Sequence, residues 1–313
     1  MKRQQAFVNK ENKMLKGGLH CHTTRSDGLG TPEEVEALHK KNGYDFLALT
    51  DHRRYNYRDF APELDLLIIP GMEFDNGSIP FEGGRRVFHT VCIGPKKEDG
   101  NGFLQYEESE KLKPAVAMDQ EAYQPYLDDI HAKKNLTVYC HPEWSATPAR
   151  YFDKLKGNFA IEIWNTGCFM DCEMDCDAPY WDELLGEGVR IYGVATDDGH
   201  GMDQHCGGWV MVNAKKDVNS VLRALENGEF YSSCGPEIYD FYVDDGKVVI
   251  DCSAVDRVRI HSDGHATRIV RSKGEPITHA EIPLGSIPYS YVRLSIVDEN
   301  GKKAWTNPIF LNE

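Results

Sequence analysis

Short apolar runs alternate with helix-like stretches from about residue 15 to residue 235. The runs predict β-strands at residues 14–19, 46–49, 66–69, 87–93, 136–139, 159–163, 191–195 and 209–212. An alternation of this kind is typical of β/α units. The first part of the chain is therefore expected to be an α/β domain.

Helix signals fill the gaps between these runs. Thr31 can cap a helix N-terminus, Pro32 suits the first turn, and Gly43 offers a stop after the stretch VEALHKKN. Further helices are predicted at residues 120–134, 180–188 and 218–227.

The pattern changes after Gly235-Pro236. Strand-like runs such as IYDFYV, VRIHS and YVRLSIV are separated by turn signals such as DDGK and DENGK, with no helical pattern between them. We therefore predict two domains. An α/β domain spans residues 1–234, and a small all-β, sandwich-like domain spans residues 235–313.

Polar side chains follow the apolar runs of the first domain. Because the carboxyl ends of parallel strands lie at the same edge of a sheet or barrel, these side chains are expected to converge in one mouth. Each alone would be a hydrogen-bonded structural residue, but their shared position at the strand ends indicates a site. The residues concerned are His20, His22, Asp27, Asp51, His52, Glu73, His89, His141, Asp197, Asp198 and His200.

The types of side chain indicate metal ions. Imidazole nitrogens and carboxylate oxygens suit Zn, Mn or Fe, and His20 and His22, two apart on a strand, point to the same face. The set is larger than one ion needs, so two to three divalent ions are expected. Adjacent ions can share a bridging carboxylate and activate a metal-bound hydroxide for in-line attack on phosphorus. Glu73 is the bridging candidate because it alone among the acids follows a long apolar run.

Five separated motifs resemble those of the PHP (polymerase and histidinol phosphatase) superfamily of metal-dependent phosphoesterases. The opening GGLHCHTTRSDG is followed by a predicted helix and FLALTDH, and then GMEF, FHTVCIG, CHPEW and TDDGH come in the family's order. This resemblance spans about residues 15–205. The C-terminal run from SSCGPEIYDFYV to AWTNPIFL resembles a β-domain appended to some of these phosphoesterases.

The resemblance implies a distorted (β/α)7 TIM-like barrel with a trinuclear metal centre. Asp198 is preferred to Asp197 as a ligand because its two-residue step to His200 fits the family's D-x-H pattern. The aspartate form at Asp27 is similar to members that act on small phosphorylated molecules. By this correspondence the first ion is held by His20, His22, Glu73 and Asp198, the second by Glu73, His89 and His141, and the third by Asp27, His52 and His200.

Several further residues are expected to support the reaction. A phosphate monoester usually needs arginine for its remaining oxygens, and Arg53 and Arg54 directly follow His52. His205 is a candidate general acid for the leaving group. Glu162 and Asn165 end another predicted strand and are expected to orient ligand imidazoles. The tryptophans Trp144, Trp164 and Trp209 are expected to pack.

Composition restricts the partners. The 313 residues carry 50 acidic and 35 basic side chains, a formal charge of −15, which disfavours a long nucleic acid and favours a small phosphorylated substrate. No run has the 18 or more apolar residues of a membrane helix, and the first 18 residues have no apolar signal core. Together with nine cysteines interpreted as reduced thiols, this predicts a cytoplasmic protein without a membrane partner.

Two alternatives stay open at this stage. An amidohydrolase-like enzyme that cleaves C–N bonds would use similar ligands, although it would usually present a bridging lysine where Glu73 stands. A non-catalytic metal-binding scaffold, in which the β-domain binds a partner, would be expected to have lost some ligands. The sequence does not give the substrate, the choice between monoester and diester, the metal or the oligomeric state.

Overall fold

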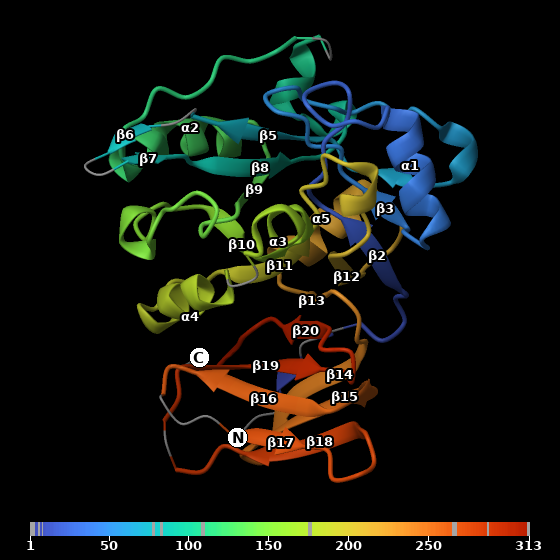
Figure 1. Ribbon diagram of the computed structural model, residues 1–313, viewed down its shortest axis with the longest axis vertical. Helices are drawn as coiled ribbons and strands as arrows, with labels where there is room; N and C mark the ends of the chain where they lie inside the picture. Colours follow the sequence, from blue (N-terminus) through green and yellow to red (C-terminus); the bar gives the residue numbers. More distant parts are fainter. Residues whose placement is uncertain are drawn as a thin grey trace.

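The computed structural model describes residues 4–5, 7, 9–76, 79–81, 84–107, 110–174, 177–264, 268–286 and 288–311. Figure 1 shows an upper part with helices around strands and a lower part built of strands. We call residues 9–234 the α/β region and residues 235–311 the β region. The mixed α/β class predicted from the sequence is confirmed for the first of these.

Apart from a separate hairpin, the strands of the α/β region belong to two sheets. In one sheet β2, β3 and β4 run parallel and β12 pairs antiparallel to β2. In the other, β9, β10 and β11 are parallel, whereas β8 is antiparallel to both β5 and β9. The strands are β2 (Met14–Gly18), β3 (Phe46–Leu47), β4 (Leu67–Ile68), β5 (Gly71–Asp75), β8 (His89–Ile93), β9 (Leu136–Tyr139), β10 (Asn158–Asn165), β11 (Tyr192–Thr196) and β12 (Trp209–Asn213).

Isolated bridges link the two sheets. Cys21 bridges Gly199 and His52 bridges Glu73, both in parallel fashion, and Asn56 bridges Gly71 in antiparallel fashion. Among the described residues, strand pairing does not close into the barrel that the sequence predicted. The strands β2 and β12 are each paired on both edges and so offer no free edge to β11, and β3 and β4 have only two residues each. The two parallel bridges lie at or beside predicted metal ligands, so the ligand-bearing loops join the sheets.

Buried apolar side chains from successive strands fill the space between the sheets. Gly17 makes room for one of them, because a Cβ atom at this position would lie 1.9 Å from the Phe46 ring. The core includes Leu15, Leu19, Phe46, Ile69, Val91, Val138, Ala160, Val194 and Val210. This core fixes the strand ends that carry the polar residues.

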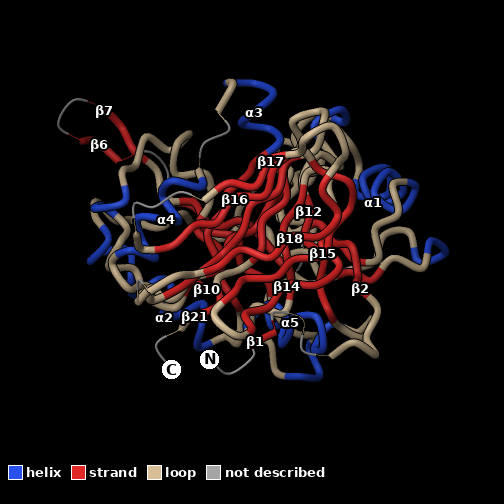
Figure 2. The backbone as a smooth tube through the Cα atoms, turned by 90° about the horizontal axis from the view of Figure 1, so that it is seen from below, coloured by secondary structure: helices blue, strands red, loops and turns tan. Residues whose placement is uncertain are grey.

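Five helices lie at the periphery of the described chain, as Figure 2 shows from below. Thr31 caps α1 in a capping box with Glu34, as the sequence signal predicted, while Asp119 and Asp217 cap α2 and α5. The helices are α1 (Pro32–Lys41), α2 (Gln120–Ala132), α3 (Thr166–Cys172), α4 (Ala178–Gly186) and α5 (Val218–Glu226).

The β region consists of two facing sheets. The large sheet continues from β12 through β13, β20, β19 and β16 to β17, and β21 pairs with β19; the small sheet has the order β1, β14, β15, β18. Side chains of both sheets share one core, which includes Phe241, Val248, Val258 and Leu294. Two strands from outside residues 235–311 belong to these sheets, β1 (Gln4–Gln5) and β13 (Phe230–Ser233). The strands of the β region itself are β14 (Ile238–Asp244), β15 (Lys247–Val255), β16 (Arg257–Ser262), β17 (Ile269–Arg271), β18 (Ile277–Pro283), β19 (Tyr291–Val297), β20 (Lys303–Thr306) and β21 (Ile309–Phe310).

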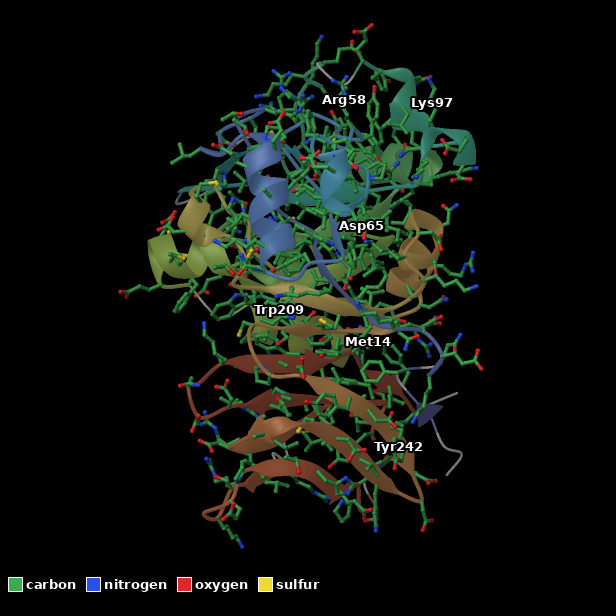
Figure 3. The ribbon with its side chains drawn as sticks, turned by 90° about the vertical axis from the view of Figure 1, so that its right-hand side faces the viewer. Met14, Arg58, Asp65, Lys97, Trp209 and Tyr242 are labelled. Carbon is green, nitrogen blue, oxygen red and sulfur yellow. The ribbon has the colours of Figure 1, made fainter. Side chains whose placement is uncertain are left out.

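The two regions are joined through the large sheet and through side chains. Because β13 pairs with β20, the sheet passes without a break between them, and Met14 and Trp209 lie near this junction in Figure 3. Arg293 on β19 is fully buried, forms an ion pair with Asp182 on α4 and lies over the Trp181 ring. The division at residue 234 stays a prediction.

The remaining elements are short. A hairpin joins β6 (Ile79–Phe81) to β7 (Gly84–Arg86), and 3-10 helices occur at Pro62–Leu64, Lys97–Asp99, Gly102–Gln105, Ala149–Tyr151 and Met202–Gln204. Within the described residues no helix combines the length and apolar character that crossing a membrane requires. The cysteines that the structure describes are free thiols, and Cys176 lies outside the described residues.

Candidate metal centre

The predicted ligands converge at one end of the α/β region. His20, His22 and Asp27 follow β2, His52 follows β3, His141 follows β9, and Asp198 and His200 follow β11. Two placements differ from the sequence interpretation. Glu73 lies inside β5 and does not follow a strand, and His89 begins β8 and does not end it. Because β8 is antiparallel to its neighbours, its amino end lies at the same edge as their carboxyl ends.

Strained backbone accompanies several of these positions. Arg53, His141 and Asp198 have φ values of 57°, 27° and 49°, in the left-handed region that residues other than glycine seldom adopt. Each costs of order 1–3 kcal/mol. His141 and Asp198 each lie two residues beyond the end of a strand, and Arg53 follows the isolated bridge at His52. Strain of this kind is typical of functional sites, where the surrounding structure holds it in place.

Four side chains form an inner group. His22 Nε2 lies 3.3 Å from His20 Nε2 and 3.0 Å from Asp198 Oδ1, and the distances from the two histidines to Glu73 are 3.5 and 3.4 Å. Two ligands each about 2.1 Å from one ion are about 3.0 Å apart in an octahedral site and about 3.4 Å apart in a tetrahedral site. The inner group therefore has the dimensions of a coordination shell.

Glu73 also contacts further histidines with both carboxylate oxygens. Oε1 lies 2.8 Å from His89 Nδ1 and 3.3 Å from His141 Nε2, while Oε2 lies 2.9 Å from His52 Nδ1. The carboxylate thus stands between the inner group and a second set of imidazoles. This is the position that a bridging ligand of two ions would take.

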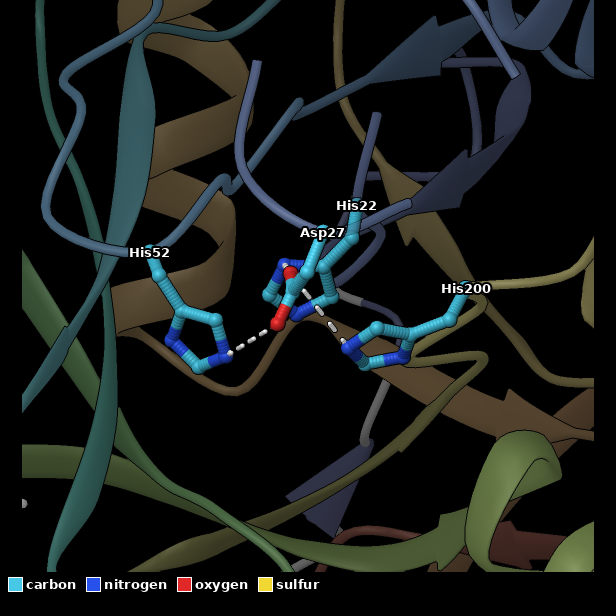
Figure 4. Close-up of side chains that lie close together, drawn as sticks. All are labelled: His22, Asp27, His52 and His200. Carbon is cyan, nitrogen blue, oxygen red and sulfur yellow. Dashed lines mark ion pairs between the residues drawn. The ribbon is translucent and has the colours of Figure 1, made fainter. Parts of the chain in front are cut away.

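A third group lies at the mouth of the site. Asp27 is half exposed, and His22, His52 and His200 each approach its carboxylate to 3.6 Å. Figure 4 shows Asp27 between His52 and His200, with the ion pairs drawn as dashed lines. The His200 Nδ1–H donates to the carbonyl of Asp198 at 3.0 Å, which leaves Nε2 to face Asp27.

A buried carboxylate, Glu162, orients the inner ligands. Its Oε1 accepts hydrogen bonds from His20 Nδ1 at 2.6 Å and from the Thr196 hydroxyl at 2.7 Å. Its Oε2 accepts the backbone N–H of His141 at 2.9 Å and the amide of Asn165 at 3.1 Å. A carboxylate can only accept, so His20 carries its proton on Nδ1 and directs the Nε2 lone pair into the site.

The electrostatics of the site favour positive charge among its carboxylates. Burial alone would lower the pKa of His20, but Asp198, Glu162 and Glu73 outweigh it and raise that pKa well above its usual value. Burial would also lower the pKa of His52, but Glu73 and Asp75 outweigh it and raise that pKa to about 11. The pKa of Glu73 is held well below its usual range although burial opposes this.

The donor set fits divalent metal ions. Glu73 Oε2 and His52 Nδ1 are buried and have no hydrogen bond of acceptable geometry within the described chain, although they lie 2.9 Å apart. Buried polar atoms without partners are costly, and cations placed among these oxygens and nitrogens would satisfy them. Six histidines and three carboxylates are the ligand types that Zn, Mn or Fe accept.

Two hollows adjoin the ligands. The first, of about 300 Å³, has a wall formed by Trp144, Gly167, Cys168, Asp171 and Cys172; we call it the tryptophan hollow. The second, of about 250 Å³, has a wall formed by Ser26, Arg53, Asp75 and Lys111; we call it the arginine hollow. Asp27, His52 and His89 line both of them.

Of the candidate arginines and the candidate general acid, one residue lines a hollow and the other two do not. Arg53 lines the arginine hollow with its Nε 3.2 Å from Asp75, whereas Arg54 and His205 are not among the described residues that line either hollow. His205 is buried, and its ring packs edge-on against His39 at 5.3 Å. Burial and the nearby His39 lower the pKa of His205 to about 4. This placement gives no support to its expected role as a general acid.

Trp144 is the main residue whose role the sequence interpretation missed. Its ring packs against His89 and His141 as expected, but the side chain is also 44% exposed and lines the tryptophan hollow, which the expectation of packing alone did not include. Trp164, by contrast, is buried as expected. The available signal was the position of Trp144 three residues after the ligand His141 in the motif CHPEW.

Comparisons with known proteins give distant structural similarities. No model of a protein family matches the sequence, and no curated protein matches it. A two-domain protein from Bacteroides vulgatus containing a predicted PHP-like metal-dependent phosphoesterase is 15% identical, with 99% of both chains covered and a TM-score of 0.48.

Two partial similarities accompany it. An amidohydrolase from Chromobacterium violaceum with bound sulfate and no metal is 16% identical over 59% of this chain and 88% of that chain, with a TM-score of 0.40. A protein from Bifidobacterium adolescentis described as a metal-dependent phosphoesterase is 14% identical over 68% of this chain and 96% of that chain, with a TM-score of 0.43. At these similarities the function has to be argued from the side chains of this chain.

Proposed function

We propose that the chain is a PHP-type metal-dependent phosphoesterase that hydrolyses a phosphate ester of a small molecule. The observation that carries the proposal is the Glu73 carboxylate, which contacts His20 and His22 of the inner group and also His89, His141 and His52. Adjacent ions that share a carboxylate are suited to in-line displacement at phosphorus. A trinuclear centre, with its third ion at Asp27, His52 and His200, is the form we propose.

Each part of the site has a task in this proposal. Bound divalent ions would supply an activated water and positive charge for the phosphoryl oxygens. Glu162 fixes the tautomer of His20, and the buried inner group keeps bulk water from its carboxylates. Arg53, which lines the arginine hollow, would donate to phosphoryl oxygens that the ions leave free. The formal charge of −15 favours a small substrate over a long polyanion.

The alternatives from the sequence are less well supported. An amidohydrolase-like site for C–N bonds would usually have lysine in the bridging position, where this chain has Glu73 in contact with several histidines. A non-catalytic scaffold would not need all nine predicted ligands, each of which contacts at least one other. A panel of phosphate and amide substrates distinguishes the phosphoesterase from the amidohydrolase-like enzyme. The metal content of the purified protein distinguishes it from the non-catalytic scaffold.

The direct test removes ligands. Protein purified without chelators should contain two to three equivalents of Mn, Fe or Zn by elemental analysis and should hydrolyse an aryl phosphate. His20→Ala and Glu73→Ala should each lower kcat/KM by more than about 100-fold, because loss of a ligand should exceed the 10- to 100-fold cost of losing a residue that orients one.

A matched control keeps the test specific. His279 forms an exposed pair with Asp251 in the β region, so His279→Ala should keep full activity and metal content. Circular dichroism should show all three variants folded. Unchanged turnover in both His20→Ala and Glu73→Ala would exclude the metal centre described above.

A further inference from the structure

The metal centre opens into two hollows of different chemistry. The tryptophan hollow is walled by an indole, two cysteines and one aspartate, whereas the arginine hollow is walled by Arg53 and Lys111 together with Ser26 and Asp75. Both reach the same ligands, Asp27, His52 and His89. A substrate bound to these ligands can therefore extend in two directions that favour different groups.

Trp144 is exposed but firmly positioned. Its turn is closed by a hydrogen bond from the Ser145 N–H to the carbonyl of His141 at 3.0 Å, and the Glu143 N–H donates to Asp177 at 2.9 Å. The indole packs edge-on against the His141 ring, with centroids 5.0 Å apart. An exposed indole held on a fixed turn beside the ligands loses little conformational entropy when a ring packs against it.

The wall that helix α3 contributes is also fixed. Helix α3 carries Cys168, Asp171 and Cys172, and the Gly167 N–H in its first turn donates to the carbonyl of Asp197 at 2.7 Å. A Cβ atom at Gly167 would lie 2.8 Å from the carbonyl oxygen of Asp198, so only glycine permits this approach. Asn165 caps the helix and also donates to Asp198 at 3.0 Å. The wall is thus connected directly to the metal centre.

Charge distinguishes the two directions. Among the described residues that line the tryptophan hollow there is no lysine or arginine, and Asp171 is exposed at its wall. A second phosphate or a carboxylate placed there would meet a negative charge with no cationic side chain beside it. Arg53 and Lys111 place the available positive side chains in the other hollow. Anionic oxygens are therefore favoured on that side alone.

We infer that the leaving group carries a ring without negative charge, which packs against Trp144 in the tryptophan hollow, while free phosphoryl oxygens face Arg53 and Lys111. This inference rests on the proposed function and adds the class of substrate to it. It makes Trp144 a specificity-determining residue. An aliphatic phosphate of the same charge would bind to the ligands without using the indole.

Binding of two inert phosphonates tests the inference without turnover. Isothermal titration of the metal-loaded full chain should show phenylphosphonate binding roughly 3- to 10-fold tighter than methylphosphonate, which is the usual range for one aromatic contact. Trp144→Ala should remove this difference and leave methylphosphonate binding unchanged. Trp144→Phe should keep most of it. Trp209→Phe, at a tryptophan that lines neither hollow, is the matched control and should change nothing.

A charged ring tests the second half of the inference. A phenylphosphonate with a carboxylate on its ring should bind more weakly than phenylphosphonate itself. Asp171→Asn should reduce this difference in affinity. Equal affinity of the wild type for phenyl- and methylphosphonate would overturn the inference alone. So would a Trp144→Ala variant that loses both ligands, because Trp144 would then only support the metal centre. A protein that binds neither phosphonate and hydrolyses no phosphate ester would overturn the proposed function and the inference together.

Discussion

Two clusters of charged side chains within the described residues are built differently. At the junction of the two regions, the Arg293 guanidinium pairs with Asp182, and Asp182 lies 3.4 Å from the His261 ring, whose Nε2 is 2.9 Å from the Ser295 hydroxyl. At the metal centre, imidazole nitrogens and carboxylate oxygens face one another in larger numbers. One cluster carries a cation of its own, and the other has only histidine protons to offset its carboxylates.

The directions of the pKa shifts express this difference. Burial and the neighbouring Arg293 lower the pKa of His261 to about 4, so the junction resists a further positive charge. At the metal centre the carboxylates overcome burial and raise the pKa of His20 and His22. A structural cluster is complete with the protein's own charges, whereas a metal-binding cluster is completed by cations from outside.

The largest effect that tests this comparison is expected at Glu162, which orients metal ligands and is not itself a predicted ligand. Glu162→Gln keeps the size of the side chain but leaves only one accepting oxygen, so either His20 Nδ1 or the His141 N–H faces an NH2 group and loses its acceptor. We expect a 10- to 100-fold loss of metal affinity, which is usual for residues that orient ligands. Competition with a chelating dye measures it.

The matched control is another fully buried glutamate. Glu36 accepts the backbone N–H groups of Phe60 and Ala61, away from the metal centre, so Glu36→Gln should leave metal affinity unchanged. Equal losses in the two variants would mean that burial of a carboxylate, and not its contact with His20, is what matters.

Removal of the cation at the junction should affect stability and not activity. Arg293→Met leaves Asp182 without its main partner, but Asp182 is about one-third exposed and can be hydrated. The loss should therefore be roughly 2 kcal/mol, below the 3–5 kcal/mol usual for a fully buried pair. Chemical denaturation measures this loss, and kcat/KM at 25 °C should stay at the wild-type value.

The exposed ion pair between Lys247 and Glu281 provides the comparison for that variant. Lys247→Met should give no measurable change in unfolding, because exposed pairs are screened by water and salt. A large loss of activity in Arg293→Met would contradict the division of the two clusters into structural and functional types.

Local signals in the sequence predicted the elements well, for physical reasons. The run at residues 136–139 coincides with β9, and the cap at Thr31 forms because the capping box involves neighbours only three residues apart. The antiparallel direction of β8 was not predictable, since an apolar run has no direction. Closure into a barrel depends on the lengths of the ladders between strands that are distant in sequence. The pattern of a single segment does not predict these lengths.

The candidate site was predictable where the ligand types stand at strand ends, and less so in its surroundings. All nine predicted ligands meet at one edge because chain direction and burial bring them there. Arg53 and Arg54 are adjacent in sequence, but only the three-dimensional structure distinguishes the one that lines a hollow. The exposure of Trp144 likewise depends on α3, which begins 22 residues later with Thr166.

The last expected effect concerns the pH dependence of stability at His261. The folded pKa of about 4 lies below the ordinary value of about 6.5. As the pH falls from about 6.5 to about 4, the unfolded chain binds a proton that the folded chain refuses, so the free energy of unfolding decreases. The stability is fully present above the unfolded pKa. We expect this dependence to be absent in His261→Gln, because glutamine does not titrate in this range.

The measurement compares wild type and His261→Gln by chemical denaturation at several pH values, since subtraction removes the titration of shared carboxylates. Above pH 7, where His261 is neutral in both states, the difference between the two proteins should be constant, which serves as an internal control. Below pH 6.5 the wild type should lose stability relative to the variant. A wild type that gains stability there would mean that Asp182 dominates over Arg293 at this ring, and the junction would then attract a further positive charge as the metal centre does.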